Sequence, residues 1–325
     1  MSAITYGAGF VILIVASILY ERYKEKDITQ KRIEDYEYIK NYLLNESTLA
    51  KCKKPILWIP IQFEYNARHW HSFGSRSNTC LNKPYMTLCI KSIIDHCGDD
   101  FQVCLIDDST FNKILPGWNA KINFLPDPLR DHLRYLALSK MLYYYGGMVV
   151  PPSFICLRNM KSIYNMGLSR TSMFCGEFSP ESEVSSITNF FPSMKLMGCD
   201  KDSPIMKAFI EYLERAVSSD YTEELEFTGG PERWLFRQVV NKNILLIDGK
   251  FLGVKDINSN PIALEVLLGN INARFNKKMV GLYVPDYNLT RRTNFNWFER
   301  LSYKQVLESE TIIGKYLLIS NSQNN

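Results

Sequence analysis

The sequence predicts an α/β domain with a mostly parallel sheet and flanking helices, preceded by one N-terminal transmembrane helix. Strand and helix patterns alternate from residue 55 to residue 150, which is the order of a parallel sheet whose strands are joined by helices. A helical pattern over residues 131–145 leads through Gly146-Gly147 into the apolar residues 148–150, so a helix stops at paired glycines and feeds a buried strand. The uncharged residues 1–20 predict the transmembrane helix.

Length and composition are those of an ordinary globular protein. The 325 residues can form one large domain with a well-buried core, or two small domains. Charged residues at 22% and aromatic residues at 13% limit the expected disorder to the chain ends. The net charge of +4 is too weakly basic to indicate nucleic-acid binding, and no long basic run is present. We therefore expect no nucleic acid among the partners.

The cysteines do not indicate a zinc site. The eight cysteines contain no Cys-x-x-Cys pair, and only four histidines are present, so the close ligand pairs typical of structural zinc are missing. The cysteines are scattered through apolar segments, which favours reduced, buried thiols. Disulfide bonds are the alternative and would require a secretory compartment.

Residues 1–20 predict a membrane anchor. They hold no charged side chain, and residues 10–19 are strongly apolar, which is just long enough to span a hydrocarbon layer of about 30 Å. A cleaved signal peptide or a buried helix is the alternative, although no basic start or small-residue cleavage site is evident. Basic residues follow the segment and none precedes it, which places the bulk of the chain in the cytosol. We expect a single-pass membrane protein with a helical stalk over residues 21–50 and one domain over residues 51–325.

The first strand of that domain is followed by a loop rich in hydrogen-bonding groups. Residues 55–61 form a short apolar run that predicts a buried strand, and the polar, aromatic residues 64–77 follow it. Ligands of α/β sheets bind where loops leave the carboxyl ends of the strands. Arg68 and Arg76 of this loop are therefore candidates for phosphate contacts. A surface loop with a few pinned aromatic rings is the alternative, and the sequence does not separate the two.

A second strand candidate ends at two aspartates. A helical pattern over residues 85–97 leads to the apolar residues 101–106, which are followed by Asp107 and Asp108. Carboxylates at the carboxyl end of a strand are well placed to bond a ribose or a base. Either aspartate would also serve as the cap of the next helix. Both interpretations stay open.

The central helix carries two charged residues that lie three positions apart. Asp131 and Arg134 share one helix face and can form an ion pair. The pattern Asp131, two residues, Arg134-Tyr135, then Tyr145-Gly146-Gly147 and an apolar pair resembles the core motif of GT-A-fold glycosyltransferases of the glycolipid-mannosyltransferase and capsular-polysaccharide-synthesis type. The resemblance implies a Rossmann-related GT-A fold with a nucleotide-sugar donor, and it assigns Asp131, Arg134, Gly146 and Gly147 to the donor site. A plain surface ion pair is the alternative.

The sequence departs from that family at the metal site. Where the family has Asp-x-Asp, this chain has Pro151-Pro152-Ser153. Magnesium or manganese on a diphosphate takes hard oxygen ligands, usually carboxylates, and neither Pro151 nor Ser153 supplies a charge. Three interpretations follow: the metal is held from elsewhere, lysine and arginine neutralise the leaving group, or the site is not catalytic. The histidine that related transferases often carry near their end is also missing from residues 281–297.

The resemblance continues to about residue 240. Residues 172–177 predict a strand, and a second strand over residues 189–199 precedes a helix that Ser203 caps and Pro204 opens. In the related transferases a strand that displays a small or polar residue likewise precedes a helix opened by proline. These residues therefore predict the second half of the same domain.

Residues 227–234 resemble the acceptor-side Thr-Gly-Pro motif of the family, with one extra glycine. Glycines before a helix let backbone N–H groups approach an anion, which makes Gly230 and Pro231 binding candidates. A turn without a ligand is the alternative. Glu226 and Glu232 are the nearest carboxylates that could act as the catalytic base.

The sequence is compatible with two functions. The first is a membrane-anchored glycosyltransferase that moves a sugar from a nucleotide-sugar donor to a glycan, lipid or protein acceptor, with Arg and Lys neutralising the leaving diphosphate. The second is a degenerate transferase fold that acts as a binding or assembly protein at a membrane, supported by the loss of both metal carboxylates. Fold alone does not decide between them.

Overall fold

The computed structural model describes residues 54–61, 83–179, 190–219, 224–271 and 273–322. The segments from 54 to 111 and from 121 onward belong to one compact unit, and every contact discussed below lies within it. The predicted anchor, the predicted stalk and the loop that carries Arg68 and Arg76 lie outside the described residues. In the part of the chain that is described, no helix is both long and apolar enough to cross a membrane.

A six-stranded sheet forms the centre of the unit, in the order β2-β1-β3-β6-β5-β7. Parallel pairing joins β1 to β2 and to β3, and β5 to β7, whereas β6 is antiparallel to both β3 and β5. Five strands therefore run in one direction, which confirms the α/β class and the mostly parallel sheet. The strands are β1 (Ile56–Pro60), β2 (Gln102–Ile106), β3 (Gly147–Val149), β5 (Met173–Phe178), β6 (Phe191–Cys199) and β7 (Leu245–Ile247).

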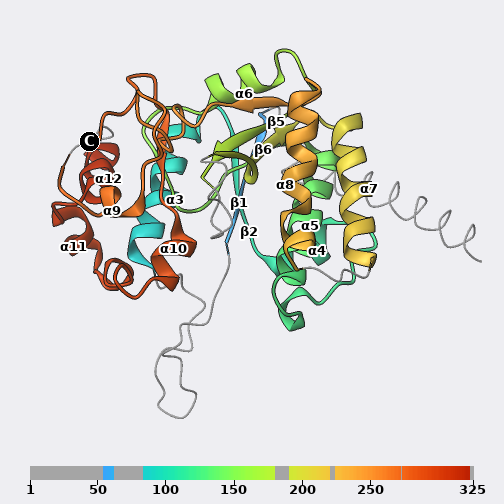
Figure 1. The fold of residues 1–325 in the computed structure, drawn as a ribbon, viewed down its shortest axis with the longest axis horizontal. Helices are drawn as coiled ribbons and strands as arrows, with labels where there is room; N and C mark the ends of the chain where they lie inside the picture. Colours follow the sequence, from blue (N-terminus) through green and yellow to red (C-terminus); the bar gives the residue numbers. More distant parts are fainter. Residues whose placement is uncertain (1–53, 62–82, 180–189, 220–223, 272, 323–325) are drawn as a thin grey trace, which may run out of the picture. The chain divides into compact units, whose positions relative to one another are not determined.

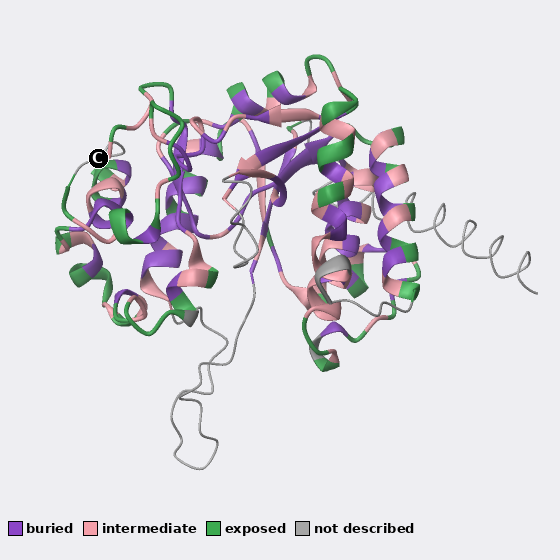
Figure 2. Ribbon diagram, viewed as in Figure 1, coloured by how far each residue is buried: buried purple, intermediate pink, exposed green. Residues whose placement is uncertain are grey.

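Burial explains why the central strands have nearly continuous apolar sequences. Ile56, Leu57, Trp58 and Ile59 of β1 are all buried, because helices cover both faces of a mostly parallel sheet. The strands are accordingly the most buried part of the fold (Figure 2). Outside the main sheet, β4 (Phe154–Cys156) pairs antiparallel with β8 (Gly281–Tyr283).

The helices form two groups, one on each side of the sheet (Figure 1). The first group contains α5 (Leu129–Tyr145), α7 (Pro204–Ser218) and α8 (Glu224–Val240). The second contains α3 (Pro84–Cys97), α11 (Tyr303–Glu308) and α12 (Ile312–Ser322). The remaining helical elements are α4 (Asp108–Ile114), η2 (Ile122–Phe124), α6 (Lys161–Leu168), α9 (Leu264–Leu267), α10 (Asp286–Arg291) and η4 (Phe298–Arg300).

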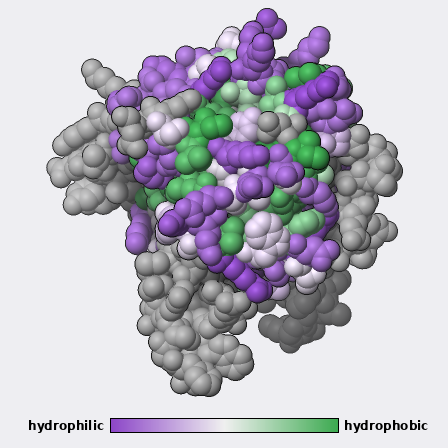
Figure 3. All heavy atoms as spheres, turned by 90° about the vertical axis from the view of Figure 1, so that its left-hand side faces the viewer, coloured by the Kyte–Doolittle hydropathy of each residue, from purple (hydrophilic) through white to green (hydrophobic). Residues whose placement is uncertain are grey.

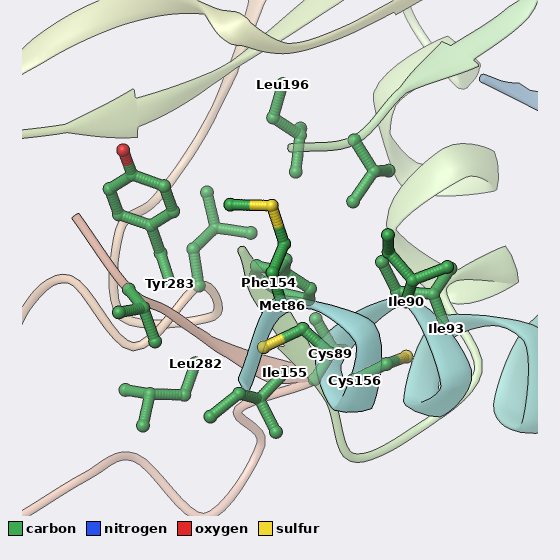
Figure 4. Packing of buried hydrophobic residues seen from close by; sticks show 14 of the residues in the cluster. Met86, Cys89, Ile90, Ile93, Phe154, Ile155, Cys156, Leu196, Leu282 and Tyr283 are labelled. Carbon is green, nitrogen blue, oxygen red and sulfur yellow. The ribbon is translucent and has the colours of Figure 1, made fainter. Parts of the chain in front are cut away.

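The core between α3 and the β4-β8 pair also includes residues of the C-terminal helices. Met86, Cys89 and Ile93 of α3 pack against Phe154 and Leu282 (Figure 4). In the same core, α12 buries Ile312, Ile313 and Leu317, and it exposes Leu318 and Ile319. Hydrophilic and apolar side chains alternate on the face that α9, α11 and α12 present (Figure 3). The C-terminal helices thus belong to the same core as the first helix that is described.

The predicted helix stop is confirmed at Gly146 and Gly147, which end α5 with φ of 71° and 96°. Only glycine adopts this left-handed region without strain. The indole Nε1 of Trp58, a buried residue of β1, donates a hydrogen bond of 3.1 Å to the carbonyl oxygen of Gly146. This bond fixes the end of the helix to the neighbouring strand. The two glycines therefore act on the fold, at the edge opposite the site described below.

The prediction for residues 227–234 is wrong. These residues lie inside α8, with Pro231 in the helix interior, so they form neither a turn nor a helix entry. Proline lacks the N–H that would bond the carbonyl four residues earlier, which here is Phe227. His132 of α5 compensates, because its Nε2 lies 3.0 Å from that carbonyl oxygen and its ring stacks on the Phe227 ring at 4.1 Å. A contact from another helix therefore supports a proline that the sequence marks as a helix breaker.

The described cysteines agree with the prediction of reduced, buried thiols. No disulfide joins any two of the six cysteines in the described segments, and all of them except Cys104 are buried. Burial raises the pKa of Cys89, Cys175 and Cys199, so the reactive thiolate is scarce at neutral pH. Cys97 and Cys156 approach to 3.7 Å between their sulfur atoms.

We expect iodoacetamide to alkylate Cys104 of the native protein at least tenfold faster than Cys89, Cys175 or Cys199, because alkylation requires an accessible thiolate. Peptide mapping by mass spectrometry after timed quenching measures each rate. In urea the four rates should converge. Rapid alkylation of Cys89 or Cys175 in the native protein would contradict the burial described here.

Candidate functional site

Five strands end at one edge of the sheet, which we call the carboxyl edge. It is marked by Pro60, Ile106, Val149, Phe178 and Ile247, the last residues of β1, β2, β3, β5 and β7. Because β6 runs against these strands and α5 ends where β3 begins, β6 and α5 both start at this edge (Figure 1). Loops at such an edge form the ligand sites of α/β proteins. The polar side chains gathered there are therefore the candidates for function.

Arg134 of α5 binds two of the predicted carboxylates at the carboxyl edge. Its Nη2 and Nε lie 2.8 Å and 3.0 Å from the two carboxylate oxygens of Asp108, and its Nη1 lies 3.3 Å from Oδ1 of Asp131. The Arg134 and Asp108 side chains are only 14% and 17% exposed. The predicted ion pair of Asp131 with Arg134 is confirmed, and Asp108 joins it from the end of β2.

Asp107 has the other role that the sequence allowed. Its Oδ1 accepts hydrogen bonds from the backbone N–H of Thr110 at 2.9 Å and from the Thr110 hydroxyl at 2.7 Å, which is the geometry of a helix N-cap. Asp107 thus caps α4, whereas Asp108 pairs with Arg134. The cap interpretation is thus confirmed for Asp107, and the contact to a ribose or base stays a prediction.

Asp108 and Asp131, which both contact Arg134, form a carboxylate cluster with an excess of negative charge. Burial alone would lower the pKa of Arg134, but the hydrogen bonds and charges of Asp108 and Asp131 raise it overall. Partial burial and the charge of Asp127 raise the pKa of Asp131. Carboxylates are hydrogen-bond acceptors that suit hydroxyl and amino donors and repel phosphate. This cluster can therefore bind the ribose or base of a nucleotide, and its arginine is already neutralised.

The residues in the Asp-x-Asp position do not fit a divalent metal. Ser153 is fully buried, and its hydroxyl lies 3.5 Å from Oδ1 of Asp286 at the start of α10. Across the residues described, no three His, Cys, Asp or Glu side chains come together as metal ligands. One hydroxyl and one carboxylate beside two prolines are too few hard oxygen ligands for magnesium or manganese. We therefore derive no step through a metal.

Asp286 is a polar residue of this edge that the sequence analysis missed. Burial, followed by the charges of Asp286 and Glu299, raises the pKa of Tyr85, whose buried hydroxyl has no hydrogen-bond partner in the described segments. The sequence feature that could have indicated Asp286 is its position directly after Pro285, at the start of a short helix. Its approach to Ser153 spans 133 residues of sequence, which no local pattern indicates.

A pocket opens between α5, β5, β6 and α8. It is about 80 Å³ in volume, which is far below the roughly 300–1,000 Å³ of sites that enclose a drug-sized ligand. Pockets of this size take one small group, not a whole nucleotide. The pocket is lined by Tyr135, Phe178, Ser179, Phe191, Ser193, Lys195 and Glu232. Tyr135 follows Arg134 directly in α5, so the pocket and the carboxylate cluster lie at the same turn of that helix.

The walls of the pocket are held by contacts behind them. The Nζ of Lys195 donates a hydrogen bond of 2.9 Å to the hydroxyl of Tyr283, and the Phe178 ring meets the Tyr283 ring edge to face at 4.8 Å. The Phe191 ring stacks on Phe236 at 5.1 Å. Aromatic contacts of this kind restrict the rings to one orientation. The pocket is therefore preformed by residues from β8 and α8.

A buried ion pair lies at the carboxyl ends of β5 and β7. Lys255 Nζ lies 2.5 Å from Oε2 of Glu177 and 3.7 Å from Oδ1 of Asp248. The same Glu177 oxygen accepts the N–H of Gly249 at 3.0 Å, and Lys255 lies over the Phe190 ring at 4.3 Å. A buried lysine that is fully surrounded in this way holds a loop in place. The sequence analysis did not identify this pair, because its members are far apart in the chain.

The remaining predicted residues fall in different places. Glu232 lines the pocket, whereas the Glu226 side chain lies outside the described part of the chain. Gly230 is inside α8, where a Cβ would meet the Tyr212 hydroxyl at 2.6 Å, so it permits the close packing of α8 on α7. Of the two predicted glutamates, only Glu232 is described as part of a site.

Buried His132 makes stability depend on pH. Burial lowers its pKa, while hydrogen bonds to the carbonyl oxygens of Phe227 and Pro128 act in the opposite direction and are outweighed. The unfolded chain, with a histidine pKa of about 6.5, then binds more protons than the folded chain just below that pH. The free energy of unfolding should therefore fall as pH drops from 6.5 to the folded pKa, and level off below it.

We expect His132→Gln to flatten this pH dependence, since glutamine does not titrate but can still donate to the Phe227 carbonyl. Urea unfolding of both proteins at several pH values between neutrality and about pH 5 measures the two slopes. Equal slopes would mean that His132 does not change its charge on unfolding.

Comparisons with known proteins give distant structural likenesses, and two of them are to glycosyltransferases. No protein-family model and no curated protein matches the chain. The solved structure of PaToxG Glycosyltransferase shares 14% identity over 65% of this chain and 79% of its own, with a TM-score of 0.32. The apo-form glycosyltransferase GlyE of Streptococcus pneumoniae TIGR4 shares 9% identity over 84% of this chain and 63% of its own, with a TM-score of 0.36. The chain thus spans less than two thirds of the GlyE chain, and likenesses at this level carry no argument about activity.

Proposed function

We propose that this chain transfers a sugar from a nucleotide-sugar donor to an acceptor hydroxyl at the carboxyl edge of its sheet. The observation that carries the proposal is the pocket that combines a carboxylate, Glu232, with an ammonium group, Lys195, next to the carboxylate cluster around Arg134. A transferase needs a base for the acceptor and a cation near the leaving group. Both lie within one small pocket.

The charged side chains at the carboxyl edge indicate how the donor would lie along it. Its ribose and base suit the carboxylate cluster, which accepts hydrogen bonds and repels phosphate. Its diphosphate would lie beyond that cluster, toward Lys195, because an ammonium group is the complementary charge. The donor sugar would then lie at the mouth of the pocket, whose volume of about 80 Å³ excludes the nucleotide.

In the proposed transfer step, residues of this chain accept the proton and stabilise the leaving group. The acceptor oxygen attacks the anomeric carbon and forms the new C–O bond, while the bond from that carbon to the diphosphate oxygen breaks. The nucleoside diphosphate leaves with the electron pair, and the acceptor proton passes to the Glu232 carboxylate, which acts as general base. Lys195 stabilises the charge that develops on the leaving oxygen.

The membrane assignment belongs to the same proposal. The apolar, uncharged residues 1–20 would tether the domain to a bilayer, and the basic residues that follow them would keep the domain on the cytosolic side. Donor nucleotides and the acceptor would then meet the enzyme at the cytosolic membrane surface.

Thermal unfolding of the full-length chain with a panel of nucleotide-sugars, with and without manganese, tests the proposal. A ligand that binds only the folded state raises stability by about 2.7 kcal/mol at a hundredfold excess over Kd. We expect one donor to raise Tm without manganese, and Arg134→Ala or Asp108→Asn to reduce that rise. Lys207→Ala, an exposed position on α7, is the matched control and should retain it.

A binding protein without transferase activity is the competing function. Its support is specific: Arg134 is neutralised by two carboxylates, and the Asp-x-Asp position holds a buried serine. If no nucleotide-sugar shifts Tm in a folded sample, the transferase proposal is overturned in its favour.

A further inference from the structure

The pocket on the carboxyl edge combines aromatic walls with hydroxyl groups. Phe178, Phe191 and Tyr135 supply three rings, and Ser179 and Ser193 supply hydroxyls. The apolar C–H face of a pyranose packs on an aromatic ring, while its hydroxyls need donors and acceptors around the rim. This mixture matches a sugar ring better than an alkyl chain, which would leave the polar groups unsatisfied.

The Ser179 hydroxyl is an independent sign of a polar ligand. It is buried and has no hydrogen-bond partner among the residues that the structure describes, although it lines the pocket. A buried hydroxyl without a partner destabilises a protein by about 1–3 kcal/mol. A ligand hydroxyl in the pocket would remove that penalty.

The charges of the pocket favour a neutral ligand. Lys195 and Glu232 are its two charged residues, so their formal charges cancel. A phosphorylated lipid that carried its phosphate into the pocket would place that anion beside the Glu232 carboxylate, which opposes it. The donor diphosphate of the proposed function stays outside the pocket. An extended peptide needs a groove with backbone partners, whereas this pocket of about 80 Å³ takes a single small group.

We propose that the pocket receives one edge of a neutral pyranose ring of a glycan acceptor, with Phe191 against its apolar face and Glu232 next to the attacking hydroxyl. This inference rests on the proposed function and selects the glycan from the three acceptor classes. The ring of Phe191 is suited to this contact, because Phe236 supports its other face at 5.1 Å and 16°. Phe178 is almost fully buried and forms the inner wall.

Saturation-transfer difference NMR on the full-length chain tests the acceptor directly, without a donor. The probes are the methyl glycosides of mannose, glucose and galactose, with glucose 1-phosphate as the charged counterpart. We expect one methyl glycoside to bind, and Phe191→Ala or Ser179→Val to weaken its binding at least tenfold. Arg237→Gln, on an exposed position of α8, should bind as the wild type does. Near-UV circular dichroism verifies that each variant is folded.

The outcomes separate this inference from the proposed function. If a nucleotide-sugar raises Tm but no methyl glycoside binds, or Phe191→Ala binds equally well, the pyranose subsite is overturned and the transferase proposal stands. If a methyl glycoside binds through Phe191 and no nucleotide-sugar does, the subsite stands and the protein is a sugar-binding protein. Tighter binding of glucose 1-phosphate than of every methyl glycoside would overturn the neutral acceptor.

Discussion

Gly147→Ala is expected to lower the free energy of unfolding by about 4 kcal/mol, which is near the upper limit for a single substitution. A Cβ at this position would lie 2.1 Å from the carbonyl oxygen of Ile56 and 2.9 Å from its carbonyl carbon. Both atoms belong to the backbone of β1, which is hydrogen-bonded to β3 and β2 and cannot move aside independently. The φ of 96° adds backbone strain to this clash. Urea denaturation followed by circular dichroism measures the loss.

Gly146→Ala is the matched control, because it changes the neighbouring glycine in the same φ region. Its φ is 71°, but the nearest atom to its Cβ would be the backbone nitrogen of Lys201 at 3.2 Å. The conformational strain of about 1–2 kcal/mol then remains without the severe clash. Equal losses for the two variants would show that the contact with Ile56 is not what requires glycine at residue 147.

Glu232→Gln is expected to reduce the transfer rate by about 10²–10⁴-fold while leaving donor binding unchanged. The substitution keeps the size and hydrogen-bonding capacity of the side chain but removes the group that accepts the acceptor proton. Loss of a general base lowers kcat and kcat/KM together. The donor found by thermal unfolding, mixed with the methyl glycoside found by NMR, is the substrate pair, and mass spectrometry detects the disaccharide product.

Arg237→Gln controls for a change of charge on the same helix, because Arg237 is exposed and outside the pocket. It should transfer sugar at the wild-type rate. Glu226→Gln decides between the two glutamates that the sequence proposed. If that variant loses transfer and Glu232→Gln retains it, the base has been assigned to the wrong residue, although the donor site would be unaffected.

The elements of the fold were largely predictable because their signals are local. The apolar run of residues 55–61 became β1, the pattern over residues 131–145 became α5, and the paired glycines end that helix. Each depends on periodicity or on a backbone preference within a few residues. The ion pair of Asp131 with Arg134 was predictable for the same reason, since the two residues lie one helical turn apart.

The failure at residues 227–234 has a definite physical origin. Glycine and proline in sequence normally end a helix, because proline leaves a carbonyl without its donor. Here His132, which lies 95 residues away in the chain, occupies that carbonyl. A tertiary contact thus reversed a strong local preference, and no feature of residues 227–234 themselves indicates it.

The sequence by itself determined five strands of the six-stranded sheet, the central helix with its glycine stop, and the alternative roles open to Asp107 and Asp108. The tertiary structure decided which side chains meet at the carboxyl edge: Asp108 with Arg134 across 26 residues, Lys195 with Tyr283 across 88, and Ser153 with Asp286 across 133. It also built the pocket from α5, β5, β6 and α8. Hydrophobic periodicity depends on residues that are close together in the sequence, so it indicates single helices and strands. Which distant loops meet at one edge depends on how the strands pair, and strand pairing involves the whole sheet.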